Sequence, residues 1–175
     1  MAFAELAERE GIRWYVFGAE AVNLYGFPRK TADLDLTIDL GERPVPELVQ
    51  RFRVAGFDPR FPDEAFIQAT RVIPVVHRPT KLPVDLVLAG PGLEQLFLER
   101  VQYERISNIE IPVIAPEHLV VTKLLAGRPK DLEDVRELLA IRKLDRTEIE
   151  TLLIELEEAL AESDLLSRFR ALGRS

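Results

Sequence analysis

The segment from Asp33 to Leu40 alternates perfectly between polar and apolar residues and reads D-L-D-L-T-I-D-L. Because the side chains of a β-strand point alternately to its two faces, this pattern predicts a strand with one buried face. The side chains of Asp33 and Asp35 then lie side by side on the same face. Two neighbouring carboxylates repel each other unless a cation lies between them. The pattern therefore indicates a candidate cation site.

The chain around this strand alternates between expected helices and expected strands. Helices are predicted where helix-favouring runs end at glycine or begin at proline, and strands where β-branched and aromatic residues cluster. Pro74 lies inside one expected strand, which favours an edge position or a bulge. The expected helices cover residues 2–10, 19–25, 44–54, 64–69 and 93–101, and the expected strands cover residues 14–17, 33–40, 72–77, 84–88 and 109–114.

From Pro116 onward only helices are expected. They cover residues 116–126 and 130–142, followed by a helix that starts at Asp145, where Glu148 completes a capping box. This last helix carries an apolar stripe made of Ile149, Leu152, Leu153, Leu156 and Leu160. We therefore predict an α/β (α+β) fold with a small mixed sheet flanked by helices. Residues 1–115 are expected to form this core, and residues 116–175 a helical subdomain packed on it.

The 175 residues contain no cysteine, which excludes disulfides, cysteine-ligated zinc and thiol catalysis. This composition suits a reducing compartment, so we expect a cytoplasmic location. The only two histidines, His77 and His118, lie far apart in the sequence, and a histidine-rich metal site is therefore not expected. Carboxylate oxygens remain as metal ligands, and these suit Mg²⁺ or Mn²⁺.

Neither secretion nor membrane insertion is expected. The N-terminal sequence MAFAELAEREGIRW lacks a basic region followed by an apolar run, so no signal peptide is predicted. No apolar stretch approaches the roughly 18 residues that a membrane-spanning helix needs. The net charge of −7 argues against broad electrostatic binding to nucleic acid. A local basic patch would still allow RNA as a substrate, which stays open.

Asp85 is the single charged residue in the apolar run L-P-V-D-L-V-L. A carboxylate in such a strand is costly unless it is paired or binds a metal. Three carboxylates on adjacent strands can hold two divalent ions about 3.5–4 Å apart, one activating an attacking oxygen and the other binding a triphosphate. The alternatives are a solvent-facing strand, whose polar side continues through Thr37 and Asp39, and a strand-edge Asp85 paired with a neighbouring arginine.

The residues Phe17-Gly18-Ala19 indicate a strand, a glycine turn and the start of a helix. Free backbone N–H groups at a helix start favour a phosphate. The fingerprints G-x-G-x-x-G and G-x-x-x-x-G-K-[ST] do not occur in the sequence, so a dinucleotide fold and a P-loop are not predicted.

The run G-A-E-A-V-N-L-Y-G-F-P-R-K-T-A-D-L-D-L, from Gly18 to Leu36, resembles the signature of the polymerase-beta-like nucleotidyltransferase superfamily. It is especially similar to the AbiEii-like proteins, many of which are toxins of toxin–antitoxin pairs. The family pattern is a hydrophobic residue and G-[GS], then R-x-T-x-D-[hydrophobic]-D, then a third carboxylate on a later strand. The matching positions are Gly18, Arg29, Thr31, Asp33, Asp35 and Asp85.

This resemblance implies a metal-dependent enzyme that moves a nucleoside monophosphate from an NTP to an acceptor hydroxyl on RNA, protein or a small molecule. It implies two Mg²⁺ or Mn²⁺ ions bound by Asp33, Asp35 and Asp85, which are also the catalytic residues. By the same resemblance, the nucleotide would be bound by residues of the first run, namely Gly18, Ala19, Arg29 and Thr31. An antitoxin protein is a candidate partner.

A second run, E-H-L-V-V-T-K-L-L-A-G-R-P-K-D-L-E-D-V, is similar to later motifs of that family. By this likeness Lys123 would contact the nucleotide phosphates, and Lys130, Asp131 and Asp134 would border the pocket. The alternatives are structural. Lys130 and Asp134 have the i, i+4 spacing of a surface ion pair, and the helix dipole alone favours Asp131 in a first turn.

Three functions follow as hypotheses. The first is an active nucleotidyltransferase. The second keeps the fold without catalysis, as a binding or regulatory module. Ala19 supports this second hypothesis, because it stands where the family has glycine or serine and brings no hydroxyl to the triphosphate. The third is a carboxylate-dependent phosphohydrolase or nuclease, which leaves the Gly18 turn without a purpose.

Overall fold

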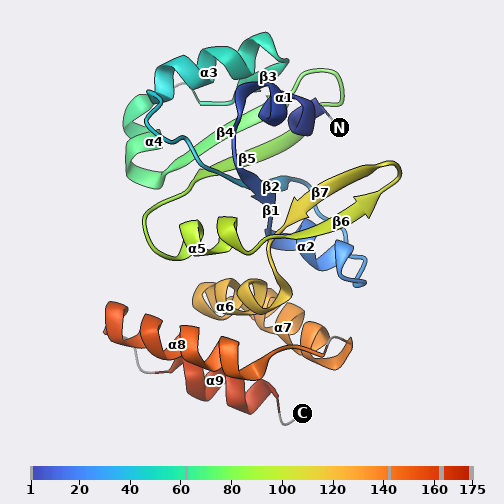
Figure 1. Cartoon of the computed structure of the whole chain (residues 1–175), viewed down its shortest axis with the longest axis vertical. Coiled ribbons are helices and arrows are strands. Elements are labelled where there is room, and N and C mark those ends of the chain that lie inside the picture. Colours follow the sequence, from blue (N-terminus) through green and yellow to red (C-terminus); the bar gives the residue numbers. More distant parts are fainter. Residues whose placement is uncertain (1, 62, 142, 162–163, 174–175) are drawn as a thin grey trace. The chain divides into compact units, whose positions relative to one another are not determined.

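The structure is a computed structural model that describes residues 2–61, 63–141, 143–161 and 164–173. These residues form two compact units. The first unit comprises the chain up to Ala21 together with residues 29–114, and the second comprises residues 22–28 and the chain from Ala115 onward. Figure 1 traces the elements of both units in sequence colours.

The first unit is built on a seven-stranded mixed sheet with the order β3-β4-β5-β2-β1-β7-β6. The pairs β2–β5 and β1–β7 are parallel, and the other neighbouring strands are antiparallel. The strands are β1 (Trp14–Val16), β2 (Leu34–Ile38), β3 (Phe57–Pro59), β4 (Val72–His77), β5 (Leu82–Leu88), β6 (Gln102–Ile106) and β7 (Ile109–Val113). The α/β (α+β) class with a mixed sheet is thereby confirmed.

Five helices accompany the described strands: α1 (Ala2–Glu10), α2 (Gly18–Leu24), α3 (Val45–Val54), α4 (Glu64–Thr70) and α5 (Leu93–Glu99). Figure 1 shows α3 beside β3 at the top of the view and α5 below β5. An aromatic cluster joins α1 to its neighbours, because Phe3 packs against Trp14 of β1, Phe52 of α3 and Phe57 of β3. Burial of these rings stabilises this side of the sheet.

The expected strand 33–40 is shorter in the structure, because β2 covers only Leu34–Ile38. Leu36 and Ile38 are fully buried, as the alternation predicted. The alternative of a solvent-facing side that continues through Thr37 is wrong at this residue, since Thr37 is only 2% exposed. Its partner in the register is Tyr15, which is equally buried and hydrogen-bonds to it. Where both faces of a sheet are covered, the polar side chains of a central strand must find their hydrogen-bond partners within the protein.

Pro74 lies in β4, which pairs on both sides, with β3 and with β5. The expected edge position is therefore wrong for the strand as a whole. The carbonyl oxygen of Pro74 accepts a hydrogen bond from the N–H of Arg60, 2.8 Å away, just beyond the end of β3. Because the N and O atoms of one residue face the same neighbour in an antiparallel pair, the missing N–H of Pro74 faces the end of β3 and costs no bond to β5.

Strands β3 and β6 were not predicted. β3 has three residues, and one of them is Pro59. β6 pairs only with β7, and its Tyr103 is 65% exposed, so this strand lacks the buried face that periodicity detects. The other expected elements of this unit are confirmed, with ends that differ by at most two residues.

The second unit contains the helices α6 (Pro116–Ala126), α7 (Pro129–Ile141), α8 (Arg146–Leu160) and α9 (Leu165–Leu172). The first three were expected, whereas α9 was not. The expected end at Arg142 lies outside the described residues. In the apolar stripe of α8, Leu160 is the exception, because it lies at the helix end and is half exposed.

Asp145 caps α8 as predicted, and its side chain accepts hydrogen bonds from the N–H groups of Thr147 and Glu148. The return bond of the capping box is replaced, because the N–H of Asp145 donates to Glu117 of α6. Glu148 instead contacts the buried His118 of α6, with 3.2 Å between Oε1 and Nε2. Both contacts join α8 to α6 within this unit.

No helix of the described residues has both the length and the apolar character needed to cross a membrane.

Candidate active site

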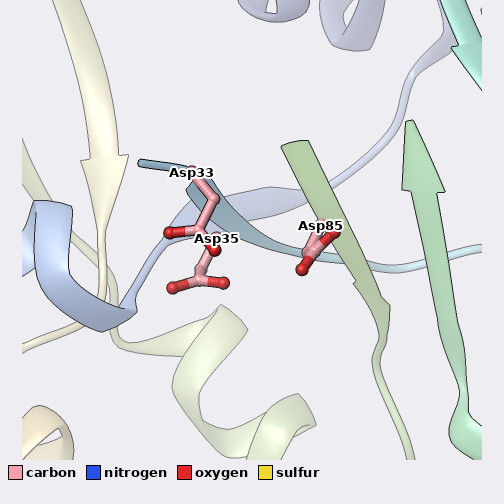
Figure 2. Close-up of side chains that lie close together, drawn as sticks. All are labelled: Asp33, Asp35 and Asp85. Atoms are coloured by element: carbon pink, nitrogen blue, oxygen red, sulfur yellow. The ribbon is translucent and has the colours of Figure 1, made fainter. Parts of the chain in front are cut away.

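Three aspartates converge on adjacent strands of the first unit. Asp35 of β2 and Asp85 of β5 are direct partners in the parallel register, so their side chains lie on the same face. Asp33 immediately precedes β2. One carboxylate oxygen of each residue lies within 4.8 Å of the other two. Figure 2 shows the three side chains directed toward a common space between the two strands.

Thr31 holds Asp33 in place. Its hydroxyl oxygen lies 3.1 Å from both the carbonyl oxygen and the carboxylate Oδ1 of Asp33. A threonine two residues before an aspartate can donate to either oxygen and so stabilises the bend that precedes the strand. The structure therefore brings Thr31 to the aspartates, as a neighbour that orients one carboxylate.

Gly18 lies directly against Asp35. Its φ of +67° belongs to the left-handed region, and a Cβ at this position would meet the Oδ2 and Cγ atoms of Asp35, the latter at 2.9 Å. The N–H of Phe17 also donates to the carbonyl oxygen of Asp35, 3.1 Å away. Glycine is needed here for two reasons, the backbone conformation and the close approach of the carboxylate. The turn and the carboxylates thus form one local structure.

Two further residues of the resemblance lie near this turn and these aspartates in the sequence. Ala19 directly follows Gly18, and Arg29 comes shortly before Asp33. Ala19 is buried, with 9% of its surface exposed, so its methyl group belongs to the core. Arg29 is half-buried and interacts with another residue of the structure. Both residues lie in the first unit, as do Gly18, Thr31 and the three aspartates.

Asp85 forms an ion pair with Arg60, whose Nη2 donates to the carboxylate Oδ1. A neighbouring arginine was one of the alternatives considered for Asp85, although β5 lies inside the sheet and not at its edge. Arg60 was not identified from the sequence. It follows β3, and since that short strand was not predicted, no pattern placed Arg60 beside β5.

The donor set fits a hard divalent cation. Three half-buried carboxylates supply oxygen ligands from a rigid sheet, and Mg²⁺ and Mn²⁺ prefer oxygen. The fit therefore rests on the positions and the chemistry of these three side chains.

Lys123, Asp131 and Asp134 form a buried ion cluster in the second unit. The ammonium Nζ of Lys123 lies 3.1 Å from Asp131 Oδ1 and 2.7 Å from Asp134 Oδ2. All three residues are at most 5% exposed. Arg128 binds Asp131 from the solvent side. Burial opposes the ionisation of Asp131, but the hydrogen bonds from Arg128 and Lys123 outweigh it and lower the pKa of this carboxyl.

This cluster revises the structural alternatives for α7. Asp134 is not a surface residue, since it is buried against Lys123, whereas Lys130 is exposed. Asp131 does lie in the first turn of α7, but it is fully buried and binds two cations, so more than the helix dipole acts on it. The nucleotide contacts expected of Lys123, Lys130 and Asp131 stay predictions.

Comparison with known proteins gives a family for this chain. The family described as "Nucleotidyltransferase of unknown function (DUF6036)" matches residues 3–173. No curated protein matches the chain in a sequence comparison.

Solved structures with a similar fold share little sequence with the chain. An antigenic nucleotidyltransferase-like protein from Paracoccidioides brasiliensis has a TM-score of 0.58 and 19% identity, and the match covers 97% of this chain and 89% of that one. The antibiotic-resistance factor ANT(2'')-Ia has a TM-score of 0.62 and 15% identity, with coverages of 91% and 90%. The lincosamide antibiotic adenylyltransferase LnuA, bound to lincomycin, has a TM-score of 0.55 and 16% identity, with coverages of 80% and 94%. At these identities the likeness shows a shared fold.

Proposed function

The chain belongs to the DUF6036 family of nucleotidyltransferases, and on this premise we propose that it transfers a nucleoside monophosphate from an NTP to an acceptor hydroxyl and releases pyrophosphate. The enzyme class agrees with the one expected from the sequence. The observation that carries the proposed reaction is the convergence of Asp33, Asp35 and Asp85 beside the Gly18 turn.

Each aspartate has a role in this proposal. Asp33 and Asp35 would hold two divalent ions, Mg²⁺ or Mn²⁺, and Asp85 would complete one of the two sites. When bound, such ions neutralise the charge of the triphosphate and make the acceptor hydroxyl more acidic. The acceptor oxygen forms a bond to the α-phosphorus while the bond from that phosphorus to the bridging oxygen breaks, and pyrophosphate leaves. Asp85 accepts the proton of the hydroxyl through the oxygen that does not bind Arg60.

The nucleotide would bind on the Gly18 side of the aspartates. Gly18 and Ala19 offer backbone N–H groups, and Arg29 and Thr31 precede Asp33 along the chain. Ala19 has no hydroxyl and its methyl group is buried, so main-chain N–H groups alone would serve at this position. Lys123, Lys130 and Asp131 are proposed to contact a nucleotide on the likeness of their motif alone.

The acceptor is proposed to carry a free hydroxyl, on a small molecule, RNA or protein. A small molecule has the support of two similar folds. One is the lincosamide adenylyltransferase, and the other is ANT(2'')-Ia, which is also known in complex with adenylyl-2''-tobramycin. Incubation with NTPs labelled at the α-phosphorus and a cell extract, followed by separation of small molecules, RNA and protein, identifies the labelled class.

The test of the active site is NTP binding with and without Mg²⁺. Binding should need the ion and should be lost in Asp33→Asn and in Asp35→Asn, while circular dichroism stays unchanged. Asp58→Asn is the matched control, because Asp58 is a half-exposed carboxylate of the same unit that pairs with Arg78. Metal-dependent NTP binding that persists in both site variants would refute the proposal.

The same measurements separate the other hypotheses. A non-catalytic binding module binds no NTP in an ion-dependent way, and a nuclease cleaves nucleic acid without NTP. A toxin of the AbiEii-like type predicts growth arrest on expression, which Asp35→Asn should relieve. Growth arrest that persists in Asp35→Asn would argue against a toxin that acts through this site.

A further inference from the structure

Arg60 is a cation bound to one of the three site aspartates. Its Nη2 and the Oδ1 of Asp85 form an ion pair, and the two side chains are 33% and 30% exposed. Both partners are therefore reached by water. A partly hydrated ion pair is weak enough to exchange with another cation, unlike a fully buried pair.

The sheet register holds Arg60 in this position. Asp35 pairs with Asp85, and Asp85 pairs with Pro74 of β4. Arg60 follows Pro59, whose partner is Val75, and its N–H donates to the carbonyl oxygen of Pro74. Arg60, Pro74, Asp85 and Asp35 thus occupy one row across four neighbouring segments. Directly opposed residues share a face, so Arg60 and Asp85 lie on the same face with Pro74 between them. The ring of Pro74 is short, and the long side chain of Arg60 can therefore extend past it to the carboxylate of Asp85.

We propose that Arg60 is the intramolecular counter-ion of Asp85 and weakens the binding of any divalent ion that uses Asp85. This inference rests on the proposed function, because it takes the three aspartates as the ion site. Loss of the Arg60 guanidinium therefore strengthens ion binding only where the Asp85 carboxylate is a ligand.

The physical reason is direct competition for one carboxylate. A divalent ion gains less from Asp85 while a guanidinium neutralises it, and it must replace or share the contact at Oδ1. Hydration of the half-exposed pair screens most of the attraction between its two charges, so about a tenfold effect on the ion affinity is expected.

The experiment measures binding of Mn²⁺ alone, without nucleotide, by calorimetry and by the electron paramagnetic resonance signal of free Mn²⁺. Arg60→Gln should tighten the Mn²⁺ binding that depends on Asp85 about tenfold, whereas Arg60→Lys, which keeps the charge, should stay near the wild type. Arg53→Gln removes an exposed arginine of the same unit and should change nothing. Thermal unfolding of each variant in EDTA checks the fold.

A double-mutant cycle assigns the effect to Asp85. In an Asp85→Asn background, Arg60→Gln should leave the Mn²⁺ titration unchanged, because the carboxylate through which Arg60 acts is gone. The inference is overturned if Arg60→Gln leaves the Mn²⁺ affinity unchanged or weakens it, or if it tightens binding equally in the Asp85→Asn background. Failure of the proposed function looks different, since Asp35→Asn would then keep the full Mn²⁺ binding of the wild type.

Discussion

The carboxyl group of Asp35 lies against the α-carbon of Gly18, at a distance that leaves no room for a side chain. The turn after β1 and the strand β2 are separate in the sequence but pack closely at this point. The carboxyl group of Asp35, which is central to the proposed ion site, can take this position because Gly18 has no Cβ.

Gly18→Ala should disturb both the fold and the ion site. The left-handed conformation costs a non-glycine residue about 1–2 kcal/mol, and the clash with Asp35 adds to this cost. Gly41→Ala is the matched control, because Gly41 has a φ of +57° and open space around the position of its Cβ. Urea unfolding should show a larger loss for Gly18→Ala, and Mn²⁺ titration should show weaker binding for Gly18→Ala alone. Equal effects of the two substitutions on Mn²⁺ binding would contradict this account.

Thr31→Val should weaken the binding of Mn²⁺ while it leaves the fold nearly intact. The hydroxyl of Thr31 contacts Asp33, and its loss removes about 1 kcal/mol of hydrogen bonding at a half-buried position. Asp33 then samples other rotamers, so that the ion must order it on binding. Thr31→Ser keeps the hydroxyl and should restore the affinity. If Thr31→Ser binds Mn²⁺ as weakly as Thr31→Val, the methyl group matters and the hydroxyl does not.

Lys123→Met should destabilise the protein by about 3–5 kcal/mol, because it leaves Asp131 and Asp134 buried without their shared ammonium group. Lys130→Met on the neighbouring helix is the control and should change stability by less than about 0.5 kcal/mol, since Lys130 is exposed. The free energy of unfolding in urea measures both. A loss below about 1 kcal/mol for Lys123→Met would show that the cluster relaxes or hydrates when the lysine is removed.

The stability of the protein should fall in acid partly through Asp131. Its pKa is lower in the folded chain than the value near 3.9 expected in the unfolded chain. A lowered folded pKa means that the contribution is complete well above pH 3.9 and is lost as the pH falls through the folded value. Urea unfolding between pH 7 and pH 3 should therefore show a shallower acid dependence in Asp131→Asn than in the wild type. Parallel curves for the two proteins would exclude this carboxyl as a source of the acid sensitivity.

Much of the fold could be predicted because its central elements carry strong local patterns. β2 alternates, and α6 begins at a proline and ends at Gly127 in the left-handed conformation. β3 and β6 carry no such pattern, since the sheet neighbours β4 and β7 define them. The burial of Thr37 could not be predicted either. A polar residue on an alternating strand is exposed or buried according to which elements cover that face of the sheet.

The candidate site could likewise be predicted only where local sequence patterns indicate it. Asp33 and Asp35 could be paired from their spacing, and Asp85 stood out as a charge in an apolar strand. Their convergence depends on the parallel pairing of β2 with β5, which no local pattern specifies. Arg60 was missed for this reason, since its position depends on the register of β3, β4 and β5 together.

The register row from Arg60 to Asp35 also links ion binding to the order in which the chain folds. A slip of one residue between neighbouring strands would move Asp85 to the opposite face and separate it from Asp35. These residues lie far apart along the chain, and bringing them together costs loop-closure entropy that only the finished sheet repays. A nascent or partly folded chain would then have carboxylates but no shared site, so tight Mn²⁺ binding would report the moment at which the central strands have paired correctly.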